Sequence, residues 1–273
     1  MKVIIIGAGI AGLSAATLLK LNNQNCEIEI YEKENFIGGQ AASALYNQCY
    51  TEYSWRIFGK TYHNIHYIIN LLNIHNNFES LTNTCFIEGE NSPSANFSHF
   101  NQISNIFRNE KNKINLIKYF ALLLQSKDRL LNEYQDTNAL EYFNNNEVIK
   151  SIMGPFLGME ANKVSISGVF KNLFSVVDTT VYPFTPKDTL LSVKPTNQAL
   201  FDPWVKYLTN NGVKFYLNSE LQNINKNLNS NSISSIIINN KHIHADEYIF
   251  ACSLKPLNKI IQSNNNSLNL IKT

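Results

Sequence analysis

The sequence predicts an α/β fold in which a parallel sheet and its helices are interrupted by a mostly helical insert. Three observations lead to this prediction: the β-branched run over residues 3–6, the pattern G-x-G-x-x-G directly after it, and an Ala- and Leu-rich helical pattern over residues 13–19. The order of strand, tight turn and helix N-terminus is the layout that binds a dinucleotide pyrophosphate. With this context around it, the glycine pattern predicts a Rossmann-like FAD/NAD(P)-binding domain.

Each glycine of the pattern has a steric role in such a domain. Gly7 permits the sharp turn after the strand, and Gly9 lets the backbone approach the phosphates without an intervening Cβ. Gly12 allows the helix to pack closely on the strand. Ile10 and Ala11 lie in the first helical turn, whose unpaired N–H groups are expected to face the phosphates.

A second strand is predicted over residues 26–32, and it ends in an acid, Glu32. Glu32 stands about twenty residues beyond Gly12, the expected distance for a carboxylate that accepts hydrogen bonds from ribose hydroxyls. A carboxylate here repels a 2′-phosphate, which disfavours NADP. Lys33 is assigned to the same cofactor site. The alternative interpretation of Glu32 is an ordinary exposed acid at the end of a strand.

Residues 7–40 resemble the N-terminus of the FAD-dependent amine oxidase and phytoene desaturase superfamily. Besides the glycine pattern and the acid, they contain Gly38-Gly39-Gln40 where the family has G-G followed by a basic residue. The resemblance implies that Gly39 lets the chain pass close to the FAD pyrophosphate, with Gln40 beside it. Because Gln40 replaces Arg or Lys, one charge-assisted phosphate contact is lost or supplied elsewhere. The alternative for the glycine pair is a plain loop turn.

The resemblance extends over later segments, at residues 52–64, 196–205, 219–224 and 245–252. It implies that Leu221 touches the adenine side of the cofactor through its backbone. Arg56, with the aromatic residues Trp55, Phe58 and Tyr62 around it, is interpreted as a wall facing the cofactor or the substrate. The equally weighted alternative is that the aromatic side chains belong to the core and Arg56 is a surface charge.

The domain organisation follows from the same segments. Residues 1–62 and 202–253 are predicted to form a discontinuous FAD-binding domain, residues 63–201 a mostly helical substrate or cap region, and residues 254–273 an Asn-rich tail. Within the second part of the FAD-binding domain, strands are expected over residues 213–217 and 233–238. Asn239-Asn240 reads as the turn of a hairpin.

Composition narrows the class of partner. The chain has 273 residues, 44% of them hydrophobic, and a net charge of +2 with scattered charges, which argues against binding of nucleic acid or an anionic membrane. No signal peptide or transmembrane segment is expected, so the predicted location is the cytoplasm. The histidines and the four cysteines lack the spacing of a metal site, so no metal site is predicted. The thiols are expected to be reduced; they belong to Cys26, Cys49, Cys85 and Cys252.

The leading functional hypothesis is an FAD-dependent oxidoreductase of the amine oxidase or desaturase type. Hydride would pass from a C–H bond of an amine or an apolar, isoprenoid-like small molecule to the flavin. No residue can be assigned as catalytic. The C-terminal flavin-binding segment typical of the superfamily is not found, so a second chain could supply that half. The alternatives are a non-catalytic FAD- or dinucleotide-binding module and an NAD-dependent dehydrogenase that shares only the glycine fingerprint.

Overall fold

The computed structural model describes residues 1–54, 56–59, 62–81, 113–145, 160–177, 189–227 and 232–263. The chain divides into two compact units. The first contains residues 1–58 and 64–80 and the chain from residue 190 onward, and the second contains residues 59–63 and 81–189. The candidate site discussed below is built within the first unit.

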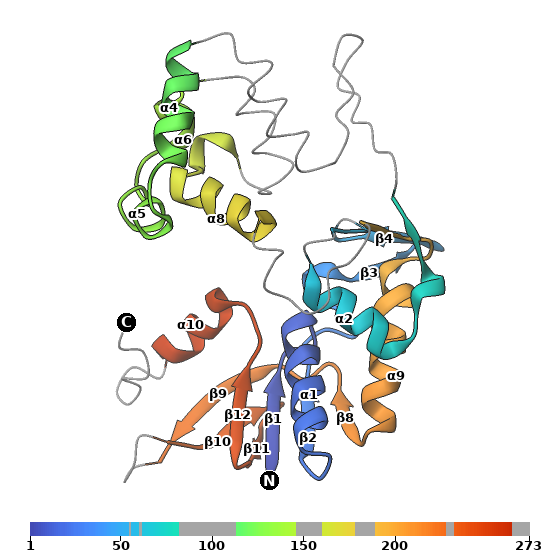
Figure 1. Cartoon of the computed structure of the whole chain (residues 1–273). Coiled ribbons are helices and arrows are strands. Elements are labelled where there is room, and N and C mark those ends of the chain that lie inside the picture. The colour runs from blue at the N-terminus through green and yellow to red at the C-terminus, as the bar shows by residue number, and fades with distance from the viewer. Residues whose placement is uncertain are drawn as a thin grey trace. The chain divides into compact units, whose positions relative to one another are not determined.

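A four-stranded parallel sheet, in the order β12-β1-β2-β8, forms the centre of the first unit (Figure 1). Its strands are β1 (Lys2–Ile6), β2 (Glu27–Tyr31), β8 (Val213–Tyr216) and β12 (Glu247–Phe250). In register, Ile5 of β1 lies between Ile30 of β2 and Ile249 of β12. The observed parallel sheet confirms the predicted α/β class.

Two helices, α1 (Ile10–Asn22) and α9 (Asp202–Asn210), pack with one face of this sheet in a shared apolar core (Figure 1). From β1, Val3 and Ile5 point into this core. Trp204 of α9 is fully buried there, and its indole Nε1 donates to Thr17 Oγ1 of α1 at 2.8 Å. This hydrogen bond satisfies the one polar group of a large apolar side chain and holds the two helices together.

The opposite face of the sheet is covered by a three-stranded antiparallel sheet in the order β11-β10-β9. Its strands are β9 (Leu221–Lys226), β10 (Ile233–Ile238) and β11 (Lys241–Ile243), and helix α10 (Leu254–Ser263) packs against β9. Ile4 and Ile6 of β1 alternate with Val3 and Ile5 and join this second core. Because both faces of β1 are buried, its side chains are apolar at every position after Lys2.

Two smaller sheets complete the first unit. A hairpin pairs β3 (Ser43–Tyr46) with β4 (Cys49–Glu52), and a three-stranded antiparallel sheet has the order β5-β7-β6. The remaining elements are β5 (Ile57–Phe58), β6 (Phe78–Ser80), β7 (Leu190–Ser192), α2 (His63–Leu72), the short 3-10 turns η1 (Gly39–Ala41) and η2 (His75–Asn77), and the π-turn η4 (Asn197–Phe201). From α2, Ile68 and Ile69 are buried in the core that α1 and α9 share.

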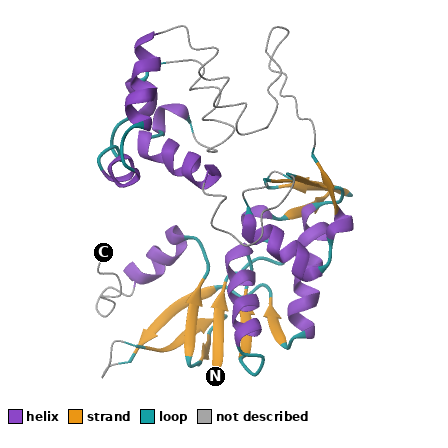
Figure 2. Cartoon of the chain, viewed as in Figure 1, coloured by secondary structure: helices purple, strands orange, loops and turns teal. Residues whose placement is uncertain are grey.

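The regular elements described in the second unit are helical (Figure 2). They are α4 (Lys113–Leu123), α5 (Lys127–Asn132), α6 (Ala139–Tyr142), the 3-10 turn η3 (Ala161–Lys163) and α8 (Ile166–Val177). Side-chain oxygens begin two of them: Ser126 Oγ accepts from Arg129 N before α5, and Asn138 Oδ1 accepts from Glu141 N before α6. The core of this unit includes Leu122, Leu130, Leu140, Phe143, Ile166 and Phe170.

The units differ in extent from the domains expected from the sequence. Residues 64–80 and 190–201, expected in the helical insert, belong to the first unit. The reason is their buried side chains: Ile69 of α2 and Phe201 of η4 lie in the core beneath the sheet. Likewise, residues 254–263, expected to begin a tail, form α10, which packs on β9.

Two further observations concern the described residues alone. They contain no helix that is both long and apolar enough to cross a bilayer. They also contain no group of three or more His, Cys, Asp or Glu side chains placed to bind a metal ion. Cys85 lies outside the described residues.

Candidate functional site

The turn between β1 and α1 depends on glycine at its first position. Gly7 has φ +107°, a conformation that side chains with a Cβ rarely adopt. A Cβ at this position would also lie 2.8 Å from the carbonyl oxygen of Ala251, at the end of β12. Gly7 N–H donates to the carbonyl of Tyr31 at 2.8 Å, so the turn is tied to both strands that flank β1.

Gly12 places α1 directly on this turn. A Cβ on Gly12 would lie 2.0 Å from the carbonyl oxygen of Gly7, far inside contact distance. Only a glycine lets the helix approach the turn so closely. The packing role expected of Gly12 from the sequence therefore agrees with the geometry.

Gly9 is different because the protein itself leaves room beside it. A Cβ on Gly9 would meet its nearest atoms, the Gly38 oxygen and Gly39 Cα, at 3.9 Å, which is ordinary contact. The first intrahelical hydrogen bond of α1 is donated by Leu13 N to the Gly9 carbonyl at 3.0 Å. The N–H groups of Ile10, Ala11 and Gly12 therefore have no acceptor within the helix. A bare backbone at a helix N-terminus, with N–H groups that the helix itself does not use, fits a dinucleotide phosphate.

The Gly38–Gly39 pair crosses directly over this helix start. Gly38 N–H donates to the Ala8 carbonyl at 3.0 Å, and Gly38 forms a short parallel bridge with Gly9. Both glycines have left-handed backbones, with φ +117° and +58°. Gln40 follows with an exposed side chain. The structure thus brings the glycines of both sequence motifs together at one point.

Glu32 is fixed beside the same turn. Its two carboxylate oxygens accept from backbone N–H groups, Oε2 from Ala8 at 2.8 Å and Oε1 from Glu34 at 3.0 Å. The residue is only 8% exposed, so Glu32 is not the ordinary surface acid of the alternative interpretation. Each oxygen keeps a second lone pair that can accept from a ligand hydroxyl.

The side chain of the neighbouring Lys33 forms an ion pair with Glu34. Its ammonium group lies 3.1 Å from the Glu34 carboxylate, and this hydrogen-bonded ion pair raises the pKa of Lys33. The side chain of Lys33 is exposed. A contact between Lys33 and a cofactor stays a prediction.

Leu221 begins β9 close to Glu32. The backbone brings them near each other, because Ser219 N–H donates to the Glu32 carbonyl at 2.8 Å. The Leu221 side chain is buried in the core with Ile4 and Tyr31, so only its backbone is left to meet a ligand. This arrangement is compatible with the expected backbone contact, which stays a prediction.

The segment around Arg56 gives a mixed result. Phe58 is buried and meets Phe78 edge to face with ring centroids 5.5 Å apart, so Phe58 is a core residue, as the alternative interpretation had it. Tyr62 is exposed, and Trp55 lies outside the described residues. Arg56 is half-buried and its carbonyl accepts from Ser192 N at 3.0 Å, which anchors its backbone to β7.

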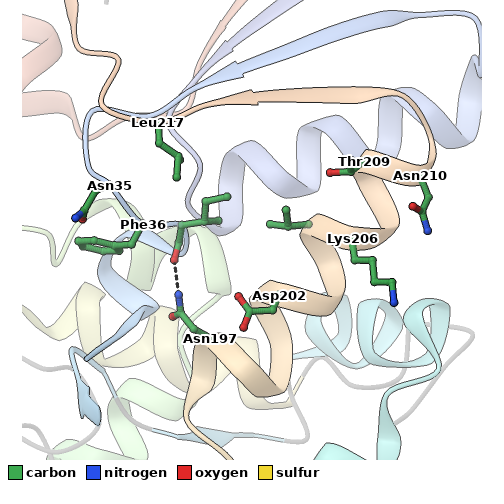
Figure 3. Close-up of a pocket in the computed structure, with 10 residues that line it drawn as sticks. Asn35, Phe36, Asn197, Asp202, Lys206, Thr209, Asn210 and Leu217 are labelled. Carbon is green, nitrogen blue, oxygen red and sulfur yellow. Dashed lines mark hydrogen bonds between the residues drawn. The ribbon is translucent and has the colours of Figure 1, made fainter. Parts of the chain in front are cut away.

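A separate pocket of about 500 Å³ opens beside α9 (Figure 3). It is lined by Asn35, Phe36, Ile37, Asn197, Asp202, Val205, Lys206, Thr209, Asn210 and Leu217. Burial raises the pKa of Asp202 above its ordinary value. None of the residues predicted to bind the cofactor lines this pocket. Figure 3 shows the hydrogen bond from the Asn197 side chain, in η4, to the Ile37 carbonyl, which no sequence motif predicted.

Comparison with known families identifies the region that holds the glycine loop. The family described as "NAD(P)-binding Rossmann-like domain" matches residues 5–73. These residues form a Rossmann-like domain. The matched residues contain the whole of the β1–α1 turn, Glu32 and the Gly38–Gly39 crossing described above. A search of curated proteins by sequence finds no match.

Solved structures share the fold of this Rossmann-like domain and of the chain around it. An oxidoreductase from Methanosarcina mazei matches with a TM-score of 0.64 and 17% identity, covering 92% of this chain and 58% of its own. A Pyrococcus furiosus protein matches with a TM-score of 0.66 and 16% identity over 97% and 62% of the two chains. A CLA-producing fatty acid isomerase from P. acnes matches with a TM-score of 0.57 and 16% identity over 94% and 60%.

The chain spans about 60% of the length of these structures. At such identities the likeness establishes a shared fold. Among the proteins that share the fold, the one from Methanosarcina mazei is described as an oxidoreductase.

Proposed function

We propose that this chain binds FAD through its Rossmann-like domain and acts as an FAD-dependent oxidoreductase of the amine oxidase or desaturase type. The observation that carries the proposal is the space beside Gly9. A Cβ there would meet protein atoms only at 3.9 Å, so the fold itself does not require a glycine at this position. A pyrophosphate lying against the start of α1 would require one.

Each residue of the loop has a distinct part in this proposal. The N–H groups of Ile10 and Ala11 would donate to the pyrophosphate, and Gly39 would let the chain pass close to it. Glu32, already oriented by two backbone N–H groups, would accept from the ribose hydroxyls through its remaining lone pairs. The carboxylate would also repel a 2′-phosphate, which favours FAD or NAD over NADP.

The reaction proposed is removal of hydride from a C–H bond of an amine or an apolar, isoprenoid-like substrate. Bound flavin supplies the hydride acceptor, and the protein supplies binding and orientation. An apolar substrate is compatible with the fatty acid isomerase that shares this fold. That enzyme also indicates that the same fold serves reactions without a net redox change, so the substrate class has to be tested directly.

The test begins with the visible absorption spectrum of the purified chain, before and after addition of FAD and desalting. Retained flavin bands are expected for the wild-type chain and for Gly168→Ala, a control glycine in α8 whose Cβ would have its nearest contact at 3.5 Å. Gly9→Val is expected to lose the flavin while remaining folded, because its side chain would enter the space that the pyrophosphate needs.

Three other results would reject parts of the proposal. Wild-type chain that is folded and colourless with FAD, but binds NAD, would favour the dehydrogenase alternative. Flavin retained equally by Gly9→Val would reject the glycine loop as the binding site. Flavin that is bound tightly but is not reduced by any amine or apolar substrate would favour the non-catalytic module.

A further inference from the structure

We propose that Asn197 is a positioning residue for the cofactor loop, and that it acts by fixing the Gly38–Gly39 crossing over the start of α1. The inference rests on the proposed binding of FAD at this loop. It arises from the contacts of a single side chain, which lies about 155 residues away from the loop in sequence.

The amide of Asn197 holds both ends of the loop. Its Nδ2 donates to the Ile37 carbonyl at 2.9 Å, directly before the glycine pair. Its Oδ1 accepts from Ser43 N at 2.6 Å, directly after the turn that the pair begins. The backbone N–H of Asn197 adds a third bond, to Ser43 Oγ at 2.9 Å. One residue therefore fixes residues 37 and 43, and with them the chain between.

The segment between residues 37 and 43 needs to be held from outside, because a glycine side chain does not restrict the backbone conformation. Gly38 and Gly39 occupy left-handed conformations, but glycine populates many others at similar energy. The backbone bonds of residues 38–42 are few. Gly38 N donates to the Ala8 carbonyl at 3.0 Å, the Ala42 carbonyl accepts from Tyr53 N at 3.0 Å, and two short-range bonds close the turn, each at 3.2 Å. Released at its ends, the loop would spend less time in the conformation that leaves room for a phosphate.

The π-turn that contains Asn197 gives it a second point of contact with the loop. Phe201, at the other end of η4, is fully buried with its ring against Gly38. A Cβ on Gly38 would lie 2.7 Å from the Phe201 ring. Asn197 thus holds the loop by hydrogen bonds while Phe201 supports it by packing. Such π-turns are rare and occur often at functional sites.

The experiment compares FAD dissociation constants, measured by flavin fluorescence, for the wild-type chain, Asn197→Ala and Gln198→Ala. Gln198 is the matched control, since it is the next residue of η4, is exposed, and donates its side-chain amide to Tyr50 OH at 2.8 Å. Asn197→Ala is expected to weaken FAD binding about tenfold, because affinity falls with the populated fraction of the competent conformation. Gln198→Ala is expected to bind as the wild type does.

Hydrogen exchange without FAD separates a positioning role from a purely structural one. In Asn197→Ala, the amides of Gly38, Ala41 and Ala42 are expected to exchange faster, while those of β2 keep their protection. A lower melting temperature with an unchanged dissociation constant for FAD would overturn the proposal. Equal weakening by Gln198→Ala would overturn it as well, since the effect would then belong to η4 in general.

A conservative variant covers the case in which Asn197→Ala does not fold. Asn197→Asp keeps the acceptor for Ser43 N, but it places a charged oxygen against the Ile37 carbonyl where Nδ2 donated, so it is expected to weaken FAD binding at least as much as Asn197→Ala. Wild-type affinity in Asn197→Asp would overturn the two-ended clamp. If the wild-type chain itself binds no FAD, the proposed function fails and this inference fails with it, whereas failure in the variants alone rejects only the role of Asn197.

Discussion

Gly9 and Gly12 are expected to differ in their response to the same small change, replacement by alanine. Gly12→Ala should destabilise the fold, because the new Cβ would lie 2.0 Å from the Gly7 carbonyl oxygen, whereas ordinary contact begins near 3.4 Å. The atom in the way is backbone and cannot rotate aside. α1 and the turn then have to move apart, and Gly7 loses its hydrogen bond to the Tyr31 carbonyl.

The size of the effect follows from three contributions. Overpacking costs about 1–3 kcal/mol, and loss of the Gly7 hydrogen bond costs about 1 kcal/mol. Alanine in place of glycine inside a helix returns about 1 kcal/mol. A net loss of about 2 kcal/mol corresponds to a fall in melting temperature of about 4–8 °C for a domain of this size.

Thermal unfolding of the cofactor-free chain, followed by circular dichroism, measures this. Gly9→Ala is the matched control, because its Cβ would have 3.9 Å of clearance and its φ of −81° suits alanine. Its melting temperature is expected to stay within about 2 °C of the wild type, since glycine and alanine differ by only about 0.5 kcal/mol at an N-cap. A Gly12→Ala chain as stable as the wild type would refute the close packing of α1 on the turn.

Three further predictions follow from single contacts. Trp204→Phe should cost about 2 kcal/mol of unfolding free energy in urea titrations, because it leaves a cavity and removes the bond to Thr17; an unchanged midpoint would contradict that packing. Cys49, which is exposed, should be alkylated by iodoacetamide at pH 7 at least about tenfold faster than Cys252, whose pKa burial raises; equal rates by peptide mass analysis would refute this. Burial raises the pKa of Asp202, so ionising this carboxyl group costs stability as the pH rises above 3.8, its ordinary pKa. Asp202→Asn should therefore raise the melting temperature at pH 7 and lose that advantage towards pH 4. A gain in melting temperature that does not vary with pH would point to another cause.

The parts of the site that could be predicted from the sequence are those encoded within a short stretch of chain. The strand, the glycine turn and the helix follow one another over about twenty residues, and each glycine has its own steric reason. The hairpin turn predicted at Asn239-Asn240 is also encoded locally, and it is confirmed because both residues have positive φ. Asparagine tolerates the left-handed conformation better than most residues, and it recurs at such turns throughout the described chain.

The parts that could not be predicted are those in which distant segments meet. β7 lies between β5 and β6, joining residues near 57, 79 and 191 in one sheet, and no local pattern distinguished β7 from the helical segment around it. Asn197 reads in sequence as one polar residue in an Asn-rich chain. Its importance arises only when η4 is placed against residues 37–43. Tertiary contacts of this kind carry no periodicity for a sequence analysis to detect.

The position of β1 in the middle of its sheet has a consequence for how the chain folds. β1 lies between β2 and β12, and the turn at Gly7 is closed against Ala251, about 240 residues further along the chain. At roughly 5–20 residues per second, a ribosome needs between about 12 and 50 s to make the intervening chain. During that time the apolar strand β1 has only one of its two neighbours available. The glycine turn after β1, although it is synthesised first, therefore reaches its final shape only after the chain around Ala251 has been made.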